Sequence, residues 1–198
     1  LNSNKIIKSV ANNFVDFTSA WKQDFEAPEA VTWFGTTNET LYIFTKNTIS
    51  AISLNDVSET VTWFFFNSRP INTQEWAINH NSIVNVWINT YFLTPNNKIQ
   101  QIIRWNNNNW YEILELSHRE WWWISNLMDW LDKDQSQSFW IYLPQENIVK
   151  WHLKRDWSLI NDIIIIYDVL ENKFLIDKYK YFNDSIILDW QQYSISAI

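Results

Sequence analysis

The chain of 198 residues contains no cysteine and a single glycine, Gly35. Without cysteine, neither a disulfide framework nor a thiolate metal site is available, and the redox compartment of the protein is not readable. Average usage places glycine near 7%, so a chain of this length would ordinarily hold roughly 14 glycines. The shortage of glycine is the more unusual absence, because turns with positive φ commonly depend on that residue.

Positive charge and long apolar runs are also scarce. The 15 Lys and Arg residues stand against 22 Asp and Glu, which gives a net charge of −7. Neutralising phosphates requires clustered Lys and Arg, so we expect no direct nucleic-acid binding. The longest aliphatic run, Ile163 to Ile166, is far shorter than the roughly 20 residues that span a bilayer. We therefore expect no membrane partner, and no signal-peptide pattern is visible at the N-terminus.

Tryptophan is the residue in excess, with 15 copies. Three copies directly follow an aspartate (Trp130, Trp157 and Trp190), and Trp110 follows a run of asparagines. Asp-Gly and Asn-Gly are preferred pairs in tight hairpin turns, so these tryptophans occupy positions typical of glycine. The run from Trp121 to Trp123 would be an exposed apolar segment, whereas three glycines would form a flexible connector.

We hypothesise that most of these tryptophans stand for glycine. In some bacterial lineages and their phages the codon UGA encodes glycine, and translation of such a gene with another code exchanges glycine for tryptophan. The count fits, because 15 Trp and 1 Gly together approach the usual number of glycines. The alternative is an aromatic-rich surface that binds carbohydrate.

From Val31 onward, short β-rich runs alternate with polar turns, which is typical of an all-β domain. Residues 1–30 have a less clear pattern and are interpreted as an N-terminal connector or a partial repeat unit. A short helix is predicted over Ile124–Leu131. The predicted strands are Thr40–Thr45, Thr48–Leu54, Thr60–Phe66, Ser82–Val86, Thr90–Thr94, Lys98–Arg104, Tyr111–Leu116, Ser138–Leu143, Asn147–Leu153, Asp162–Asp168, Lys173–Asp177, Asp184–Asp189 and Gln192–Ser196.

A repeat is visible in this pattern. Tyr42, Tyr91, Tyr142 and Tyr193 recur at intervals of 49, 51 and 51 residues, and each of the first three begins a strand, an Asn-containing turn and another strand. A period near 50 residues is the size of one four-stranded propeller blade, which buries its faces against neighbouring blades. The sequence therefore predicts an all-β fold, with residues 31–198 forming a β-propeller segment of about three four-stranded antiparallel blades and the start of another. Because a closed propeller typically has four to eight blades, we expect the chain to be a fragment of a longer protein.

From Glu75 to the C-terminus the pattern resembles β-propeller structural proteins of tailed phages, including the packaged-DNA stabilisation and tail-hub type. The segments that carry the resemblance are Asn79–Thr94, Leu116–Glu120, Leu131–Leu143 and Asn161–Phe174. The resemblance implies a non-enzymatic structural and interaction module located in the virion. Its partners would be other virion proteins or neighbouring subunits.

Motifs that carry catalysis or bind metals are weak. The three histidines, His80, His118 and His152, lack the spacing of a zinc site. Asp129, Asp132 and Asp134 superficially suggest calcium, but no glutamate closes the loop as in an EF-hand, and a solvated acidic loop is the better interpretation.

Four further aspartates are candidates to supply the carboxylate pair of a glycosidase: Asp156, Asp162, Asp168 and Asp177. Aspartate at a turn is more often explained by hydrogen bonds to its own backbone. We therefore predict no catalytic, cofactor-binding or metal-binding residues and leave the binding residues unassigned. Two other functions stay open, a carbohydrate-binding propeller lectin or adhesin outside the cell or on its surface, and a propeller glycoside hydrolase.

Overall fold

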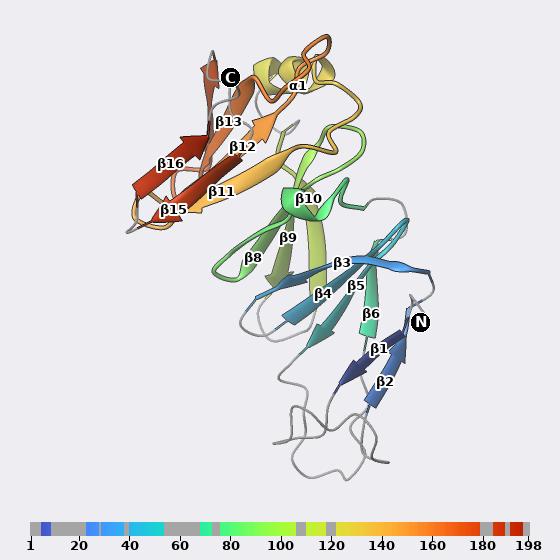
Figure 1. Ribbon diagram of the computed structural model, residues 1–198. Helices are drawn as coiled ribbons and strands as arrows, with labels where there is room; N and C mark the ends of the chain where they lie inside the picture. The colour runs from blue at the N-terminus through green and yellow to red at the C-terminus, as the bar shows by residue number, and fades with distance from the viewer. Residues whose placement is uncertain are drawn as a thin grey trace.

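The computed structural model describes residues 5–8, 23–27, 29–37, 40–53, 68–72, 76–105, 110–117, 122–178, 184–188 and 191–195. Figure 1 shows their strands grouped into successive antiparallel sheets, which follow one another in chain order from the lower to the upper part of the view. The all-β fold class predicted from the sequence is confirmed by this architecture.

Three of the sheets have four strands each, and in each sheet the strands are hydrogen-bonded in the order in which they occur along the chain. Sheet I contains β3 (Val31–Thr36), β4 (Thr40–Thr45), β5 (Ile49–Ser53) and β6 (Ser68–Asn72). Sheet II contains β7 (Val84–Val86), β8 (Asn89–Leu93), β9 (Ile99–Trp105) and β10 (Trp110–Glu115). Sheet III contains β11 (Phe139–Leu143), β12 (Ile148–Leu153), β13 (Ile163–Asp168) and β14 (Lys173–Lys178).

Two strand pairs flank the three sheets in the sequence. The first pair joins β1 (Lys5–Lys8) to β2 (Gln23–Glu26), and the second joins β15 (Asp184–Leu188) to β16 (Gln191–Ile195). In the described parts of the connections between sheets there are two short helical segments. They are the 3-10 turn η1 (His80–Ser82) before β7 and the helix α1 (Trp122–Asp129) before β11.

Among the described residues the hydrophobic core is divided into two clusters, each between successive sheets. The first joins sheets I and II and contains Tyr42, Phe44, Ile49, Ala51, Ala77, Ile83, Phe92 and Ile102. The second joins sheet II, α1 and sheet III, and its largest buried side chains include Tyr91, Met128, Trp151 and Tyr167. The interface between sheets I and II and the interface between sheets II and III are therefore each closed by side chains from both sheets.

Sheet II is buried on both faces because it lies between sheets I and III. Successive side chains of a strand point in opposite directions, so alternate residues enter the two core clusters. On β8, Tyr91 and Leu93 belong to the cluster shared with sheet III, whereas Phe92 between them belongs to the cluster shared with sheet I. On β9, Ile99 and Ile102 divide in the same way. This double burial explains why β8 is an almost unbroken apolar run rather than an alternating one.

Most of the predicted strands match observed strands within a few residues, from β4 and β5 through to β16. The prediction for Thr60–Phe66 lies outside the described residues. Four observed strands were not predicted: β1, β2, β3 and β6. The fourth strand of sheet I and its first strand were thus missed, so the four-stranded character of that sheet emerged only from the structure.

The tyrosine repeat is displaced in its third copy. Tyr42 and Tyr91 lie on the second strand of their sheets, whereas Tyr142 lies on β11, the first strand of sheet III. The connection before β11 is lengthened by α1, so a constant spacing of tyrosines meets an earlier strand there. Trp140 lies within β11, in agreement with the strand predicted over Ser138–Leu143.

The predicted helix after the three tryptophans is confirmed as α1, although it begins earlier than expected. Trp122 and Trp123 form its first turn, so the expected flexible connector is wrong for these two residues. Trp130 follows the last helical residue, Asp129, and is therefore at a helix end instead of in the expected hairpin turn. Among the described residues, no helix is long and apolar enough to cross a membrane.

Candidate functional site

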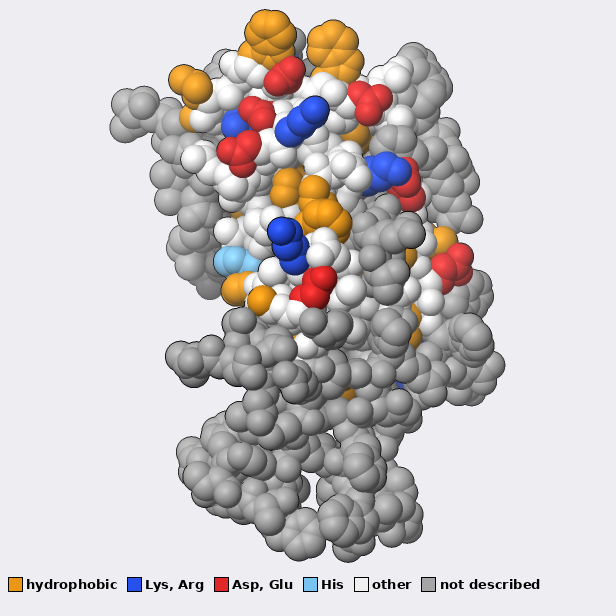
Figure 2. All heavy atoms as spheres, turned by 90° about the vertical axis from the view of Figure 1, so that its right-hand side faces the viewer, with side chains coloured by type: hydrophobic (Ala, Val, Ile, Leu, Met, Phe, Trp, Pro, Cys, Tyr) orange, Lys and Arg blue, Asp and Glu red, His pale blue; other side chains and the backbone are white. Residues whose placement is uncertain are grey.

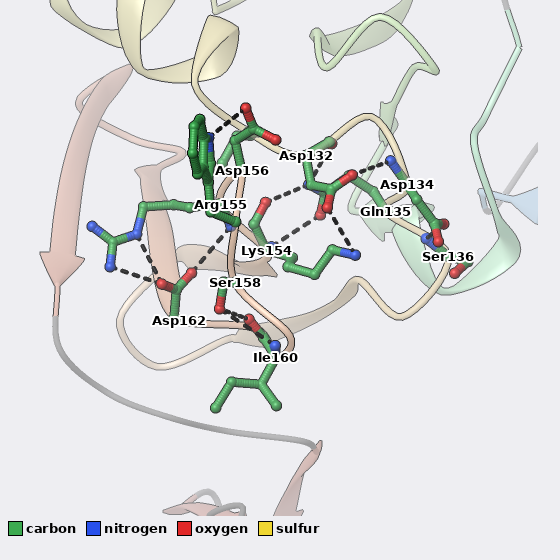
Figure 3. A network of polar contacts seen from close by, with 12 residues as sticks. Asp132, Asp134, Gln135, Ser136, Lys154, Arg155, Asp156, Ser158, Ile160 and Asp162 are labelled. Carbon is green, nitrogen blue, oxygen red and sulfur yellow. Dashed lines mark hydrogen bonds and ion pairs between the residues drawn. The ribbon is translucent and has the colours of Figure 1, made fainter.

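An extended network of polar side chains lies where two connections of sheet III meet, residues 131–138 before β11 and residues 154–162 between β12 and β13 (Figure 3). We call these two segments the loop cluster. At its centre Gln135 is fully buried. The Gln135 amide donates to the carbonyl oxygens of Asp132 at 2.8 Å and Lys154 at 2.6 Å, and its carbonyl accepts from the Lys154 N–H at 3.0 Å. This side chain thus replaces strand pairing between two irregular segments.

The acidic residues considered for calcium are used to shape this loop. Asp132 accepts the Asp134 N–H at 2.8 Å and pairs with Lys154 Nζ at 3.0 Å, while Asp134 accepts the Ser136 N–H at 3.0 Å. The backbone hydrogen bond from Asp134 is the main cause that lowers the pKa of Asp132, and Ser136 lowers that of Asp134. Among the described residues, no three His, Cys, Asp or Glu side chains are grouped to hold a metal ion.

The aspartates considered for glycoside hydrolysis are each held in a separate turn or strand. Asp162 binds the Arg155 guanidinium at 2.9 and 2.7 Å, Asp156 accepts from the Trp157 indole, and Asp168 accepts two backbone N–H groups of its own turn. Asp168 pairs with Lys173 at one end of β14, four residues from Asp177. That interval is about 13 Å along a strand, beyond the separation used by glycosidases. Asp156, Asp162 and Asp168 are therefore engaged in contacts that shape their own turns.

Two histidines are placed by aromatic stacking. His152 on β12 is buried and stacks on Phe139 with ring centroids 4.3 Å apart. Burial lowers the pKa of His152 to about 4, and the positive charge of Lys150 acts in the same direction. His80 in η1 stacks on Trp33 of β3 at 3.6 Å and so links sheet I to the start of sheet II. His118 lies outside the described residues.

A contact between equivalent segments recurs in all three four-stranded sheets. In each, the segment that precedes the first strand is hydrogen-bonded to the region where the second strand turns into the third, and we call this contact the latch. In sheet I, Glu29 accepts from the Asn47 backbone at 3.0 Å and from its side-chain amide at 2.7 Å. These bonds lower the pKa of Glu29.

The latches of the other two sheets use different groups. In sheet II the Ile78 N–H donates to the Leu93 carbonyl at 2.8 Å, so the latch is made by backbone alone. In sheet III, Gln135 bonds Lys154 as described above. The same place in each sheet is therefore closed by an acid, by backbone and by an amide, which no single sequence motif would reveal.

Asparagine side chains bind sheet II to the loop cluster. The Asn79 amide donates to the Gln135 carbonyl at 2.8 Å and to the Ser138 hydroxyl at 3.0 Å. The amide of Asn97, in the turn between β8 and β9, donates to the carbonyls of Leu131 and Asp132 at 3.1 Å. The sequence predicted the asparagine-containing turns, but nothing in it indicated that the Asn97 side chain is hydrogen-bonded to the segment before the next sheet.

Large apolar side chains are exposed in the loop cluster and directly before it. Trp130 is 71% exposed, Trp157 is 90% exposed and Leu159 is 92% exposed. The Asp156 N–H donates to the Trp130 carbonyl at 2.9 Å, which brings the two tryptophan-bearing turns together. Figure 2 shows apolar side chains projecting at the upper end of the molecule, the end that carries α1 in Figure 1. We call Trp130, Trp157 and Leu159 the apical patch.

Comparison with known proteins gives little to set beside this site. No family model matches the chain, and no curated protein matches it. Among solved structures, a mutant of the Synechocystis apocarotenoid oxygenase is similar with a TM-score of 0.45 and 7% identity, over 79% of this chain and 40% of that one. A chain from the S. cerevisiae Dbp5 complex with Nup159, Gle1, IP6 and ADP is similar with a TM-score of 0.31 and 12% identity, over 84% and 52%. This chain thus spans about half or less of the length of either.

Proposed function

We propose that this chain is a segment of a β-propeller that acts as a non-enzymatic structural and interaction module. The observation that supports the proposal best is the contact between first strands: β3 lies against β7, β7 against β11, and β11 against β15. In a propeller the blades are arranged around a central channel, so strands of successive blades that line the channel are neighbours. The order of strands within each sheet is also that of a blade, in which consecutive strands pair.

The shared cores support the same proposal. Over the central strands of sheet II both faces are covered. Sheet I covers one face and sheet III covers the other. Sheets that bury their faces against neighbours are the basis of stability in repeat proteins. The asparagine contacts hold sheet II to the segment that precedes sheet III, whereas each latch closes its own sheet.

The role in a tailed-phage virion rests on the sequence resemblance of the segment from Glu75 onward. A rigid module that presents loops and strand edges suits assembly between other subunits, and its partners would be virion proteins. Mass spectrometry of purified particles from the source phage tests this directly. We expect peptides of this protein in a fixed ratio to capsid protein, and absence from purified particles of a phage that expresses it would contradict the proposal.

Carbohydrate binding is a second candidate, favoured by the apical patch. Exposed aromatic faces provide large, rigid contact area with little loss of side-chain freedom, and Trp130 and Trp157 are neighbours in space. A glycan array with the protein, Trp130→Ala and Trp157→Ala distinguishes the two functions, with Leu159→Ala as the matched control. Binding that is lost in both tryptophan variants and kept in the control would favour the lectin, whereas the structural role predicts no bound glycan.

A further inference from the structure

Among the described residues, five that are not glycine have a backbone in the left-handed region of positive φ. Asn97, Asn147, Asn172, Trp87 and Trp157 have positive φ, at 55°, 55°, 54°, 54° and 76°. Asparagine is the residue other than glycine that most readily adopts this left-handed region, because its short side chain bonds locally. Tryptophan is among the bulky residues for which positive φ is a genuine outlier. The two tryptophans therefore need a separate explanation.

Trp87 lies in a turn that ordinarily requires glycine. Val86 and Asn89 are paired across β7 and β8, so Trp87 and Ile88 form a two-residue hairpin loop. Only the first of these two residues has positive φ. That combination is the pattern of a type II′ turn, whose first central position favours glycine because a Cβ is strained there.

Trp157 occupies the second central position of a different turn. The Ser158 N–H donates to the Arg155 carbonyl at 3.1 Å and closes a four-residue turn with Asp156 and Trp157 at its centre. Positive φ at the second central residue alone is the pattern of a type II turn, which requires glycine or asparagine there. The Trp157 side chain is almost wholly in solvent, so no packing compensates for the backbone.

Trp151 shows the opposite environment. It lies within β12 with φ in the ordinary range, is fully buried, and packs edge-on against Tyr91 with ring centroids 6.5 Å apart. Its side chain is the largest in the core between sheets II and III. Glycine at this place would leave a large cavity and weaken a central strand.

From these contrasts we infer that the native protein has glycine at positions 87 and 157 and tryptophan at position 151. The structure thereby separates two tryptophans that replace glycine from one that is a genuine core residue, a distinction that the sequence alone does not make. The consequence for the surface is concrete. With glycine at 157 the apical patch loses its most exposed ring, and the turn presents the Asp156 carboxylate instead of an aromatic platform.

Peptide sequencing of the protein from its native source tests the assignment position by position. Cleavage after lysine and arginine yields residues 151–154 and 156–173 as separate peptides, each with one of the positions in question. We expect tryptophan in the first peptide and glycine at position 157 in the second, and fragment ions that report glycine at position 87. Tryptophan at 87 or 157, or glycine at 151, would overturn the inference.

Stability measurements on the recombinant chain test the physical argument separately. Relief of left-handed strain should raise the folding equilibrium constant of Trp87→Gly and of Trp157→Gly by about five- to thirtyfold. Trp151→Gly should lower it by more than about a hundredfold or abolish folding. Trp87→Ala and Trp157→Ala are the matched controls, because alanine removes the ring but keeps the Cβ that causes the strain. Equal effects of glycine and alanine would contradict the argument.

Discussion

Gly35 shows how a single residue permits two sheets to approach. A Cβ at this position of β3 would lie 3.3 Å from Phe44 Cε2 and 3.4 Å from both Asn85 Oδ1 and Thr90 Cγ2. Phe44 belongs to the same sheet, whereas Asn85 and Thr90 belong to sheet II. The only glycine of the chain therefore lies at a close contact between sheets, where its lack of a side chain matters more than its backbone freedom.

His152 gives the stability of the protein a predictable pH dependence. Its pKa falls from 6.5 to about 4 on folding, so the unfolded chain binds the proton more tightly between these values. Linkage then requires stability to fall as pH decreases below 6.5, with the contribution complete above it. We expect a loss of up to about 1.4 kcal/mol per pH unit between pH 6 and about pH 5.

Urea unfolding of the protein and of His152→Phe measures this dependence. The window above about pH 5 is informative because ordinary carboxyl groups are already ionised there in the unfolded chain. The variant should have a distinctly flatter profile between pH 5 and 6.5. Parallel profiles for the two proteins would mean that His152 is protonated as readily in the folded state as in the unfolded one.

The sequence predicted the role of single residues correctly where that role depends only on the local backbone conformation. Asp156-Trp157 was singled out as a turn pair that should contain glycine, and position 157 has positive φ. The same reasoning was wrong for Asp129-Trp130, which ends a helix. It had no means of finding Gln135, because Lys154, the partner that defines the role of that side chain, lies beyond β11 and β12 in the sequence.

At the scale of elements, the alternation of short apolar runs with polar turns was enough to predict most strands of sheets II and III. The strands missed in sheet I have weaker patterns: β6 contains Pro70, and β3 has a bulge at Val31 to Trp33. Proline and bulges both interrupt the period of two on which strand prediction depends. The displacement of Tyr142 to a first strand was missed although the helix before β11 was predicted, because the constant tyrosine spacing was taken to mark the same strand in every repeat.

The latch of sheet III is expected to be important for stability. Gln135→Ala would remove three hydrogen bonds and leave the backbone N–H of Lys154 without its partner. Loss of a buried partner costs about 1–3 kcal/mol for each group left unsatisfied, so we expect a decrease of at least that size in the free energy of unfolding.

Gln137→Ala is the control for this experiment, because Gln137 lies in the same segment with an exposed side chain. We expect its free energy of unfolding to stay within about 0.5 kcal/mol of the parent protein in urea titrations. A comparable loss in both variants would indicate that the segment is sensitive to any change and that the latch has no special weight.

For the whole molecule, the sequence predicted the repetition and the class of fold, because a recurring strand–turn–strand pattern is visible in a single chain. It could not predict how successive sheets are held together. That depends on contacts such as Asn79 with Ser138 and Asn97 with Leu131, which join residues from different repeats. The propeller arrangement itself stays a proposal that rests on the contacts between β3, β7, β11 and β15.

An experimental structure of the protein, by crystallography or electron cryo-microscopy, measures the relation between successive sheets most directly. The proposal predicts that sheets I, II and III are related by successive rotations of one sense about a common axis, with β3, β7 and β11 nearest to it and β6, β10 and β14 farthest from it. Sheets related by translation as a flat stack, or first strands on opposite sides of the molecule, would contradict the propeller.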